Sequence, residues 1–387
     1  MPFRTASPEE LTVGVEEEYQ LVDPHSGELR GRARYVIAAD WSDDLKAEMQ
    51  QHTVEVETGI CEGTSCVRDD LARLRLQAAV AAEAAGVRIV AAGVHPFSPP
   101  EGYAFTADPV YQEIRAEYRA LAETQAIFGM HVHVGVPADV DRVRVGNVAR
   151  LYLPFLLALS ASSPWYGGRD TGYASFRSLI WRRWPRSGAP PRLEGAEEME
   201  TLLRWLRDTG CIDAPGRVYW DLRPHHKYPT LEFRVTDVTP RLEDAVAVAA
   251  LARAIVAGAV AGTLTEPELP PVITQALLGE NAWRASRDGT DAEFVDLWSS
   301  EPRAEPMRVA VERLADRLWG HAERLGDAAE LEQLGTLLDR GCAAHAIRRR
   351  AGEVEGDRGA LVRWIADETV LGAGLDRRAS QRVENSG

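Results

Sequence analysis

Four segments of the 387-residue chain alternate apolar residues with acids, histidine or arginine. They are residues 12–22, 52–60, 129–136 and 230–238. Because side chains on a β-strand alternate between its two faces, each segment would present its polar residues on one face. That shared face would carry Glu16 and Glu18, Glu55 and Glu57, His131 and His133, and Glu232 and Arg234.

Carboxylates on neighbouring strands of one sheet would repel each other. Two ionised carboxylates 4 Å apart cost about 4 kcal/mol at an effective dielectric constant of 20. A bound cation or a raised pKa would relieve that repulsion. Glutamates combined with one histidine favour magnesium or manganese over zinc. Magnesium beside an arginine suits phosphoryl transfer, because both neutralise charge on the transferred group.

Two other interpretations of these segments remain open. A solvated sheet face would also be polar, but such faces usually mix lysine, threonine, serine and glutamate, and lysine is absent from all four segments. The pair His131 and His133 also fits a zinc amidohydrolase. Such a site usually has this pair near the first strand and a bridging lysine later, and Lys227 is the only later lysine.

Glu17 breaks the alternation, because it would point into the apolar layer. A β-bulge or a buried partner is required there, and the sequence leaves both open.

The elements that position these residues are expected to form an α+β fold. Asp69 and Asp70 would cap a helix ending at Gly86, and Pro154 would kink a later helix. We expect an antiparallel sheet covered on one side by helices. One domain would span residues 1–376, and residues 377–387 would form a disordered tail. The other expected elements are a strand at 87–94, helices at 108–126 and 139–160, a functional loop at 162–191, and helices through most of 242–370.

Composition excludes several classes of protein. The net charge of −15 argues against a nucleic-acid or anionic-membrane surface. The most apolar stretch, residues 245–264, is interrupted by Arg253 and is expected to be a buried helix rather than a membrane span. The four cysteines form no CxxC motif, and the N-terminus has no apolar signal segment. Reduced thiols and a cytoplasmic location are therefore expected.

The order of these segments resembles the carboxylate–amine ligase family, the type 2 glutamate–cysteine ligases of the glutamine-synthetase-like superfamily. The resemblance covers nearly the whole chain. Its markers are Gly14-Val-Glu-Glu-Glu-Tyr, Glu48 seven residues before Glu55 in Val54-Glu-Val-Glu-Thr-Gly, Gly129-Met-His-Val-His-Val-Gly, the stretch Ser163-Pro-Trp-Tyr-Gly-Gly-Arg-Asp-Thr-Gly-Tyr, and Tyr228-Pro-Thr-Leu-Glu-Phe-Arg-Val-Thr-Asp.

The resemblance implies a curved antiparallel sheet that forms a funnel-like active site, with helices on its outer face. It implies ATP and two or three Mg²⁺ ions, with Mn²⁺ as an alternative. Glu18, Glu48 and Glu55 would hold one ion. Glu16, His131 and Glu232 would hold another that bridges the ATP phosphates. Arg234 would contact the γ-phosphate, and the residues expected to be catalytic are Arg234, Glu232 and Glu55.

The implied reaction joins a carboxylate to an amine through an acyl phosphate, with glutamate and cysteine as the family's named substrates. The partners would be small molecules, and the analogy allows a homodimer. A different acceptor amine remains open, as does a silent nucleotide- or amino-acid-binding protein that would have lost a ligand. The candidates for holding a substrate carboxylate or phosphate are Arg169, Tyr173, Arg177 and Arg223. Two of these, Arg177 and Arg223, are also candidates for binding the nucleotide. The resemblance gives no role to Glu57, His133 or Lys227.

Overall fold

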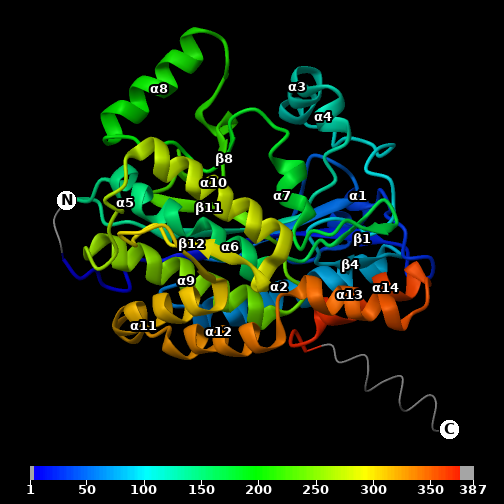
Figure 1. Ribbon diagram of the computed structural model, residues 1–387. Coiled ribbons are helices and arrows are strands. Elements are labelled where there is room, and N and C mark those ends of the chain that lie inside the picture. The colour runs from blue at the N-terminus through cyan, green and yellow to red at the C-terminus, as the bar shows by residue number, and fades with distance from the viewer. Residues whose placement is uncertain (1–3, 375–387) are drawn as a thin grey trace.

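A seven-stranded antiparallel sheet lies at the centre of the computed structural model, which describes residues 4–374 (Figure 1). Its strand order is β10-β11-β5-β1-β3-β2, and β4 also pairs with β1. The four patterned segments form the adjacent strands β11, β5, β1 and β3, so the predicted alternation places their polar residues on one continuous face. The strands are β1 Val13–Val22, β2 Leu45–Ala47, β3 Thr53–Glu57, β4 Arg88–Val90, β5 Gly129–Gly135, β10 Leu222–Pro224 and β11 Thr230–Asp237.

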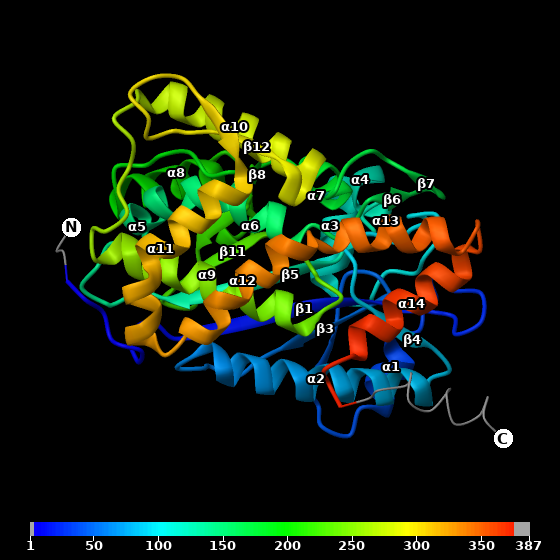
Figure 2. The same ribbon diagram turned by 60° about the horizontal axis from the view of Figure 1, so that its bottom comes forward.

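Helices cover the apolar face of the sheet. The helices α2 (Thr64–Ala84), α6 (Leu153–Ser160) and α9 (Leu242–Val260) pack directly on the strands. A second layer, α11 (Met307–Leu325) and α12 (Ala328–Arg340), packs on α9, and α14 (Arg358–Val370) packs on β4. Figure 2 shows α2, α11 and α12 in front of the strands. The predicted α+β fold with helices on the outer face is confirmed.

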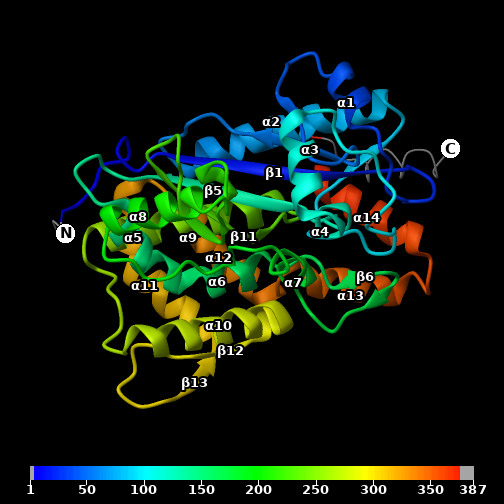
Figure 3. The same cartoon turned by 90° about the horizontal axis from the view of Figure 1, so that it is seen from above.

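Short elements surround the opposite, polar face. Seen from above (Figure 3), α3 (Pro109–Tyr118), α4 (Ala120–Glu123) and α7 (Phe176–Trp181) lie around β5 and β11. The parallel pair β8 (Ser187–Gly188) and β9 (Tyr219–Trp220) continues this layer, and α8 (Ala196–Asp208) projects beside it. The remaining elements are α1 Ala33–Ala39, α5 Arg142–Ala149, β6 Trp165–Tyr166, β7 Arg169–Asp170, α10 Pro271–Asp288, β12 Glu293–Val295, β13 Ala304–Pro306 and α13 Ala343–Glu353, with 3₁₀ turns at Arg150–Tyr152, Pro215–Arg217 and Gly289–Asp291.

Several expected element boundaries were wrong. The helix α2 begins at Thr64 rather than after Asp69 and Asp70, because the carboxylate of Asp327 accepts hydrogen bonds from the Thr64 amide and hydroxyl. The expected helix at 108–126 breaks at Arg119, whose φ is 53°. The expected kink at Pro154 is present, because the helix at 139–160 is interrupted by the 3₁₀ turn just before that residue. The strand expected at 87–94 is only three residues long, and the hairpin β12–β13 interrupts the C-terminal helices.

Glu17 has a buried partner. Its carboxylate accepts hydrogen bonds from Arg75 Nε at 2.8 Å and Nη2 at 2.5 Å, and from the Tyr19 hydroxyl. Glu17, Tyr19 and Arg75 are fully buried. The break in the alternation is therefore resolved by an ion pair inside the helical layer rather than by a bulge.

The expectation of reduced thiols was wrong for Cys61 and Cys66, which form a disulfide. Cys61 bridges to Val13 at the start of β1, and Cys66 lies in the first turn of α2, so the intervening turn brings the two cysteines together. Cys211 and Cys342 are free.

Residues 245–264 lie mostly in α9, which is almost wholly buried. Within residues 4–374, none of the helices has the length and hydropathy needed to cross a bilayer. The expected tail at 377–387 lies outside the described residues, and the single domain over 1–376 stays a prediction.

Candidate active site

Strand register brings the polar residues of four strands together. Glu16 on β1 lies opposite His131 on β5 and Glu57 on β3. Glu18 lies opposite Glu55. At the other end of the row, Glu232 on β11 pairs with His133 on β5 and with Arg223 on β10. A cavity of about 290 Å³ lies over this face, and it is lined by Glu16, Glu18, Glu48, Glu55, His131, Arg177, Arg223, Glu232 and Arg234 together with side chains of α3, α7 and β9.

Two overlapping groups of side chains have the spacing of metal ligands. In the first, Glu16, His131 and Glu232 place one donor atom each within 4.8 Å of one another. These are the three residues that the resemblance implied for one ion. The second group is Glu18, Glu55 and His131. Glu48 lines the same cavity but is not part of this second group, and one of its oxygens accepts the backbone N–H of Met49 at 2.9 Å.

Glu16 is held by two histidines. Its carboxylate lies 2.8 Å from His131 Nδ1 and 3.0 Å from His133 Nε2. Burial opposes ionisation of Glu16, but the contacts with both histidines outweigh it and hold the pKa of this carboxyl well below its ordinary value. Burial, followed by the charge of Arg234, lowers the pKa of His131. A neutral His131 keeps a ring nitrogen available as a ligand.

Glu48 and Glu55 have the opposite electrostatics. Burial and the nearby charge of Glu18 raise the pKa of Glu48 to about 7. Burial and repulsion by Glu48 and Glu16 raise the pKa of Glu55 well above its ordinary value. Glu18 accepts the backbone N–H of Gly129 at 2.5 Å. Buried like charges of this kind call for a cation, and oxygen-rich donor sets match magnesium, so the residues fit such an ion.

Two arginines share Glu232. Arg223 Nε donates to Glu232 at 2.6 Å, and Arg234 Nη1 donates to the other carboxylate oxygen. Burial alone would raise the pKa of Glu232, but Arg234 and Arg223 lower it well below its ordinary value. The site therefore has a cationic side on β10 and β11 and an anionic side on β1 and β3.

Arg177, a buried residue of α7, is a third cation beside the site. Its guanidinium donates to the backbone carbonyls of Arg234 at 3.3 Å and Val235 at 3.5 Å, and burial lowers its pKa. Arg169 and Tyr173 are not brought into the cavity. Arg169 is exposed on β7, and the Tyr173 hydroxyl accepts a hydrogen bond from Trp283 of α10.

Sequence patterns missed several residues around the cavity. Lys46 of β2 pairs with Glu57, which explains why Glu57 stands apart from the ligand groups. Gln125 is buried, lines the cavity, and its side-chain amide has no hydrogen-bond partner within residues 4–374. Trp181 and Trp184 also line the cavity. None of them lies in an alternating segment, so period-two reasoning gave no signal for them.

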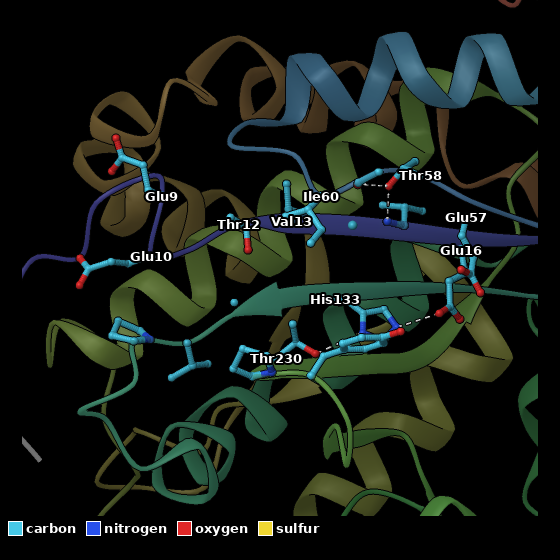
Figure 4. A pocket seen from close by; sticks show the side chains of 18 of the residues that line it. Glu9, Glu10, Thr12, Val13, Glu16, Glu57, Thr58, Ile60, His133 and Thr230 are labelled. Atoms are coloured by element: carbon cyan, nitrogen blue, oxygen red, sulfur yellow. Dashed lines mark hydrogen bonds and ion pairs between the residues drawn. The ribbon is translucent and has the colours of Figure 1, made fainter.

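A larger cavity of about 640 Å³ continues along the same polar face towards the start of β1 (Figure 4). Glu16, Glu57 and His133 lie at the end nearest the acidic cluster, and His133 lies between Thr230 and Glu16. Beyond them the lining is mainly small or apolar, with Thr12, Gly14, Val136, Pro137 and the exposed residues Ile60 and Tyr228. Lys227 is absent from the lining of both cavities.

Comparisons with known proteins agree with this geometry. The family described as "Glutamate-cysteine ligase family 2 (GCS2)" matches residues 12–364. A relative from Chloroflexus aggregans, named "Putative glutamate--cysteine ligase 2", is 38% identical over 94% of this chain and 93% of its own length.

Two solved structures share the fold. The glutamate–cysteine ligase of Francisella tularensis in complex with AMP has a TM-score of 0.66 at 13% identity, covering 96% of this chain and 94% of that one. The bifunctional glutathione synthetase of Pasteurella multocida has a TM-score of 0.64 at 16% identity over 95% of this chain, which spans about half (53%) of that protein. The match over residues 12–364 and the extended identity to a full-length relative show that the chain belongs to glutamate–cysteine ligase family 2.

Proposed function

We propose that this protein is an ATP-dependent carboxylate–amine ligase that forms an amide through an acyl phosphate. Membership in a ligase family gives the class of enzyme. The observation that carries the proposal is the convergence of two ligand groups, Glu16–His131–Glu232 and Glu18–Glu55–His131, beside two arginines in one cavity. The relatives' names support glutamate and cysteine as substrates, and another acceptor amine is the alternative.

The carboxylate oxygens of the two groups are suitable ligands for Mg²⁺, and Mn²⁺ is the alternative ion. Glu18, Glu48 and Glu55 would hold one ion, and Glu16, His131 and Glu232 another. When bound, such ions neutralise phosphate oxygens and so favour nucleophilic attack on the γ-phosphorus.

The arginines supply the charge that the protein itself brings to phosphoryl transfer. Arg234 would contact the γ-phosphate, and Glu232 would hold Arg223 and Arg234 in place through the contacts described above. The substrate carboxylate oxygen attacks the γ-phosphorus, which releases ADP and leaves an acyl phosphate. The amine then attacks the acyl carbon, and phosphate leaves. Binding both substrates in one cavity supplies proximity for both steps, so no nucleophilic side chain is needed.

The cavity of about 640 Å³ is our proposed site for the nucleoside. Its lining is largely apolar, as is usual for sites that bury a flat base. Glu16 and His133 line it, so a nucleotide whose base occupied this cavity would have its phosphates next to the first ligand group. We propose a cytoplasmic location for this reaction, and a homodimer remains an analogy with the family.

One assay tests the proposal. The protein is incubated with ATP, Mg²⁺, glutamate and a panel of amines that includes cysteine, and phosphate release is measured. We expect amine-dependent phosphate release. Nucleotide binding without turnover, or amide cleavage without ATP, would each contradict the ligase.

Two variants test the site within that assay. Glu232→Gln and Arg234→Ala should each lower turnover by about 10²–10³-fold or more. Arg234→Ala removes a cation from the transferred phosphoryl group, and Glu232→Gln removes an ion ligand and weakens the contacts that hold Arg223 and Arg234. Glu200→Gln and Arg207→Ala make the same chemical changes at exposed positions and should keep full activity. If Glu232→Gln or Arg234→Ala retained near-full activity while folded, the assignment of these residues would be wrong.

A further inference from the structure

The strand β11 is irregular at the residue that would contact the γ-phosphate. Phe233 pairs with Val132 of β5, and Thr236 pairs with Met130, so three steps along β11 match two along β5. The extra residue is a β-bulge at Arg234 and Val235. Bulges re-aim side chains and leave backbone groups without ladder partners. The Arg234 N–H instead donates to the carbonyl of Asp221 at 2.8 Å.

The helix α7 covers this bulge with two side chains one turn apart. Arg177 donates to the carbonyls of Arg234 and Val235, the two residues of the bulge. Trp181, four residues later on the same face of the helix, lies beneath the Arg234 guanidinium, whose Cζ is 5.5 Å from the ring centroid. One helix therefore contacts both the backbone and the charged end of Arg234.

Trp181 is itself fixed from the other side. Its indole Nε1–H donates to Asp221 Oδ1 at 3.1 Å, and both residues are buried. Asp221 thus holds the backbone of Arg234 through its carbonyl and the ring beneath Arg234 through its carboxylate.

The start of α7 is anchored to the end of β11. Ser175 caps the helix by accepting the Ser178 N–H, and its hydroxyl donates to Asp237 Oδ1 at 2.8 Å. The second oxygen of Asp237 accepts the Ser163 hydroxyl at 2.7 Å and the Ser162 N–H at 3.0 Å. With Asp237 at one end and Asp221 at the other, α7 is tied to both sides of the bulge.

We propose that α7 positions Arg234 for phosphoryl transfer, and that Trp181 and Asp221 are positioning residues acting through it. This inference rests on the proposed function, because the role of Arg234 belongs to that function. Glu232 accepts a hydrogen bond from the Arg234 guanidinium on one side, and the Trp181 ring bounds the guanidinium on the other. The Trp181 ring offers a desolvated cation–π surface that keeps the guanidinium extended over the cavity.

Variants at Trp181 test this inference. A desolvated cation–π contact corresponds to about a 30-fold effect, so Trp181→Leu should lower kcat by roughly that factor. Trp181→Phe keeps an aromatic face and should recover most of that loss. Asp221→Asn keeps an acceptor for the indole N–H and should stay close to wild type, whereas Asp221→Leu should resemble Trp181→Leu. The KM for the amine should change little in all four.

Two controls separate positioning from packing. Trp364→Leu makes the same change at a partly buried tryptophan on α14, where kcat should be unchanged. A double-mutant comparison of Trp181→Leu, Arg234→Ala and the two combined measures the affinity of each protein for a non-hydrolysable ATP analogue with Mg²⁺. In an Arg234→Ala background, Trp181→Leu should have no further effect on that affinity, because its effect passes through Arg234.

The outcomes are distinct. If wild type releases no amine-dependent phosphate, the proposed function fails and this inference fails with it. If wild type is active and folded Trp181→Leu matches Trp364→Leu in kcat, only the positioning role is overturned. The positioning role is also overturned if the kcat of Trp181→Phe is no higher than that of Trp181→Leu. It is overturned as well if Trp181→Leu weakens binding of the ATP analogue as much in the Arg234→Ala background as in the wild type.

Discussion

Glu16 and Glu232 differ from Glu48 and Glu55 in what neutralises them. Glu16 is paired with two histidines and Glu232 with two arginines, and the pKa of each is held low. Glu48 and Glu55 face mainly other carboxylates in a buried setting, and the pKa of each is raised. Within residues 4–374, Glu48 and Glu55 form no ion pair with a basic side chain, so a bound cation would supply the charge that they lack.

The raised pKa values predict how stability depends on pH. Between its ordinary pKa of 4.5 and its folded value of about 7, Glu48 binds more protons in the folded chain than in the unfolded chain. Its contribution to the unfolding free energy therefore falls as pH rises through that window, and Glu55 acts in the same direction. Without divalent ions, the unfolding free energy of the wild type relative to Glu48→Gln should therefore fall between about pH 5 and pH 8, because that difference cancels the titration of the buried histidines that both proteins share.

Magnesium should reverse that trend, because it binds the ionised carboxylates and gains affinity as pH rises. Thermal unfolding across this range, with Mg²⁺ and with a chelator, checks both statements. A Mg²⁺-induced stabilisation that is the same at pH 5.5 and pH 8 would contradict the assignment of Glu48 and Glu55 as metal ligands.

Glu17 gives a prediction about stability rather than activity. Glu17→Gln would leave Arg75 buried without its counter-charge, and breaking a buried ion pair in this way costs about 3–5 kcal/mol. Chemical denaturation measures that loss against Glu332→Gln, an exposed control on α12 expected to be near neutral. A loss of less than about 1 kcal/mol would show that the pair contributes little.

At the scale of elements, the site depends on close contact between β5 and α7. Gly129 begins β5, and a Cβ there would clash with the Arg177 guanidinium and lie 3.2 Å from His131 Nε2. Gly129 does not have a positive φ, so glycine is favoured here by the lack of space for a Cβ and not by backbone conformation.

Gly129→Ala is therefore expected to displace Arg177 and reduce turnover at least about tenfold, the penalty for a misplacement of about 1 Å or less near the reacting groups. Gly279→Ala on α10 is the matched control, because a Cβ there meets no atom within 4 Å. Steady-state kinetics give the kcat of each variant for this comparison. Equal kcat values would mean that the Gly129 position tolerates a side chain and that Arg177 is not tightly placed.

Period-two alternation predicted the four central strands and the face on which their acids lie. It also indicated that Glu17 needed an exception, but not which one, because its partner Arg75 comes from a helix 58 residues away. The start of α2 was wrong for the same reason, since Asp327 supplies its cap from 263 residues away. The bulge at Arg234 and the role of α7 arise from tertiary contacts, which no local pattern in residues 162–191 reveals.

At the scale of the whole molecule, the fold brings distant segments into one row. In the order β11-β5-β1-β3, the strand at residues 230–237 lies beside three strands from residues 13–135. The molecule carries a net charge of −15, yet Arg177, Arg223 and Arg234 line the same cavity as the acidic cluster. Under the proposed function, these local cations would let an acidic protein receive a polyphosphate. The same overall fold in proteins only 13–16% identical shows that the layered arrangement does not depend on a particular sequence.

The stoichiometry of Mn²⁺ binding is the most direct test of whether the two ligand groups bind divalent ions. Electron paramagnetic resonance counts bound Mn²⁺ per chain in the presence of a non-hydrolysable ATP analogue, without requiring turnover. We expect two or three bound ions in the wild type, as is usual for carboxylate-rich sites that bind a nucleotide through divalent cations. Glu16→Gln and Glu55→Gln should each lower that number, since they remove ligands from different groups. Fewer than one ion per chain, or a number unchanged in both variants, would contradict it.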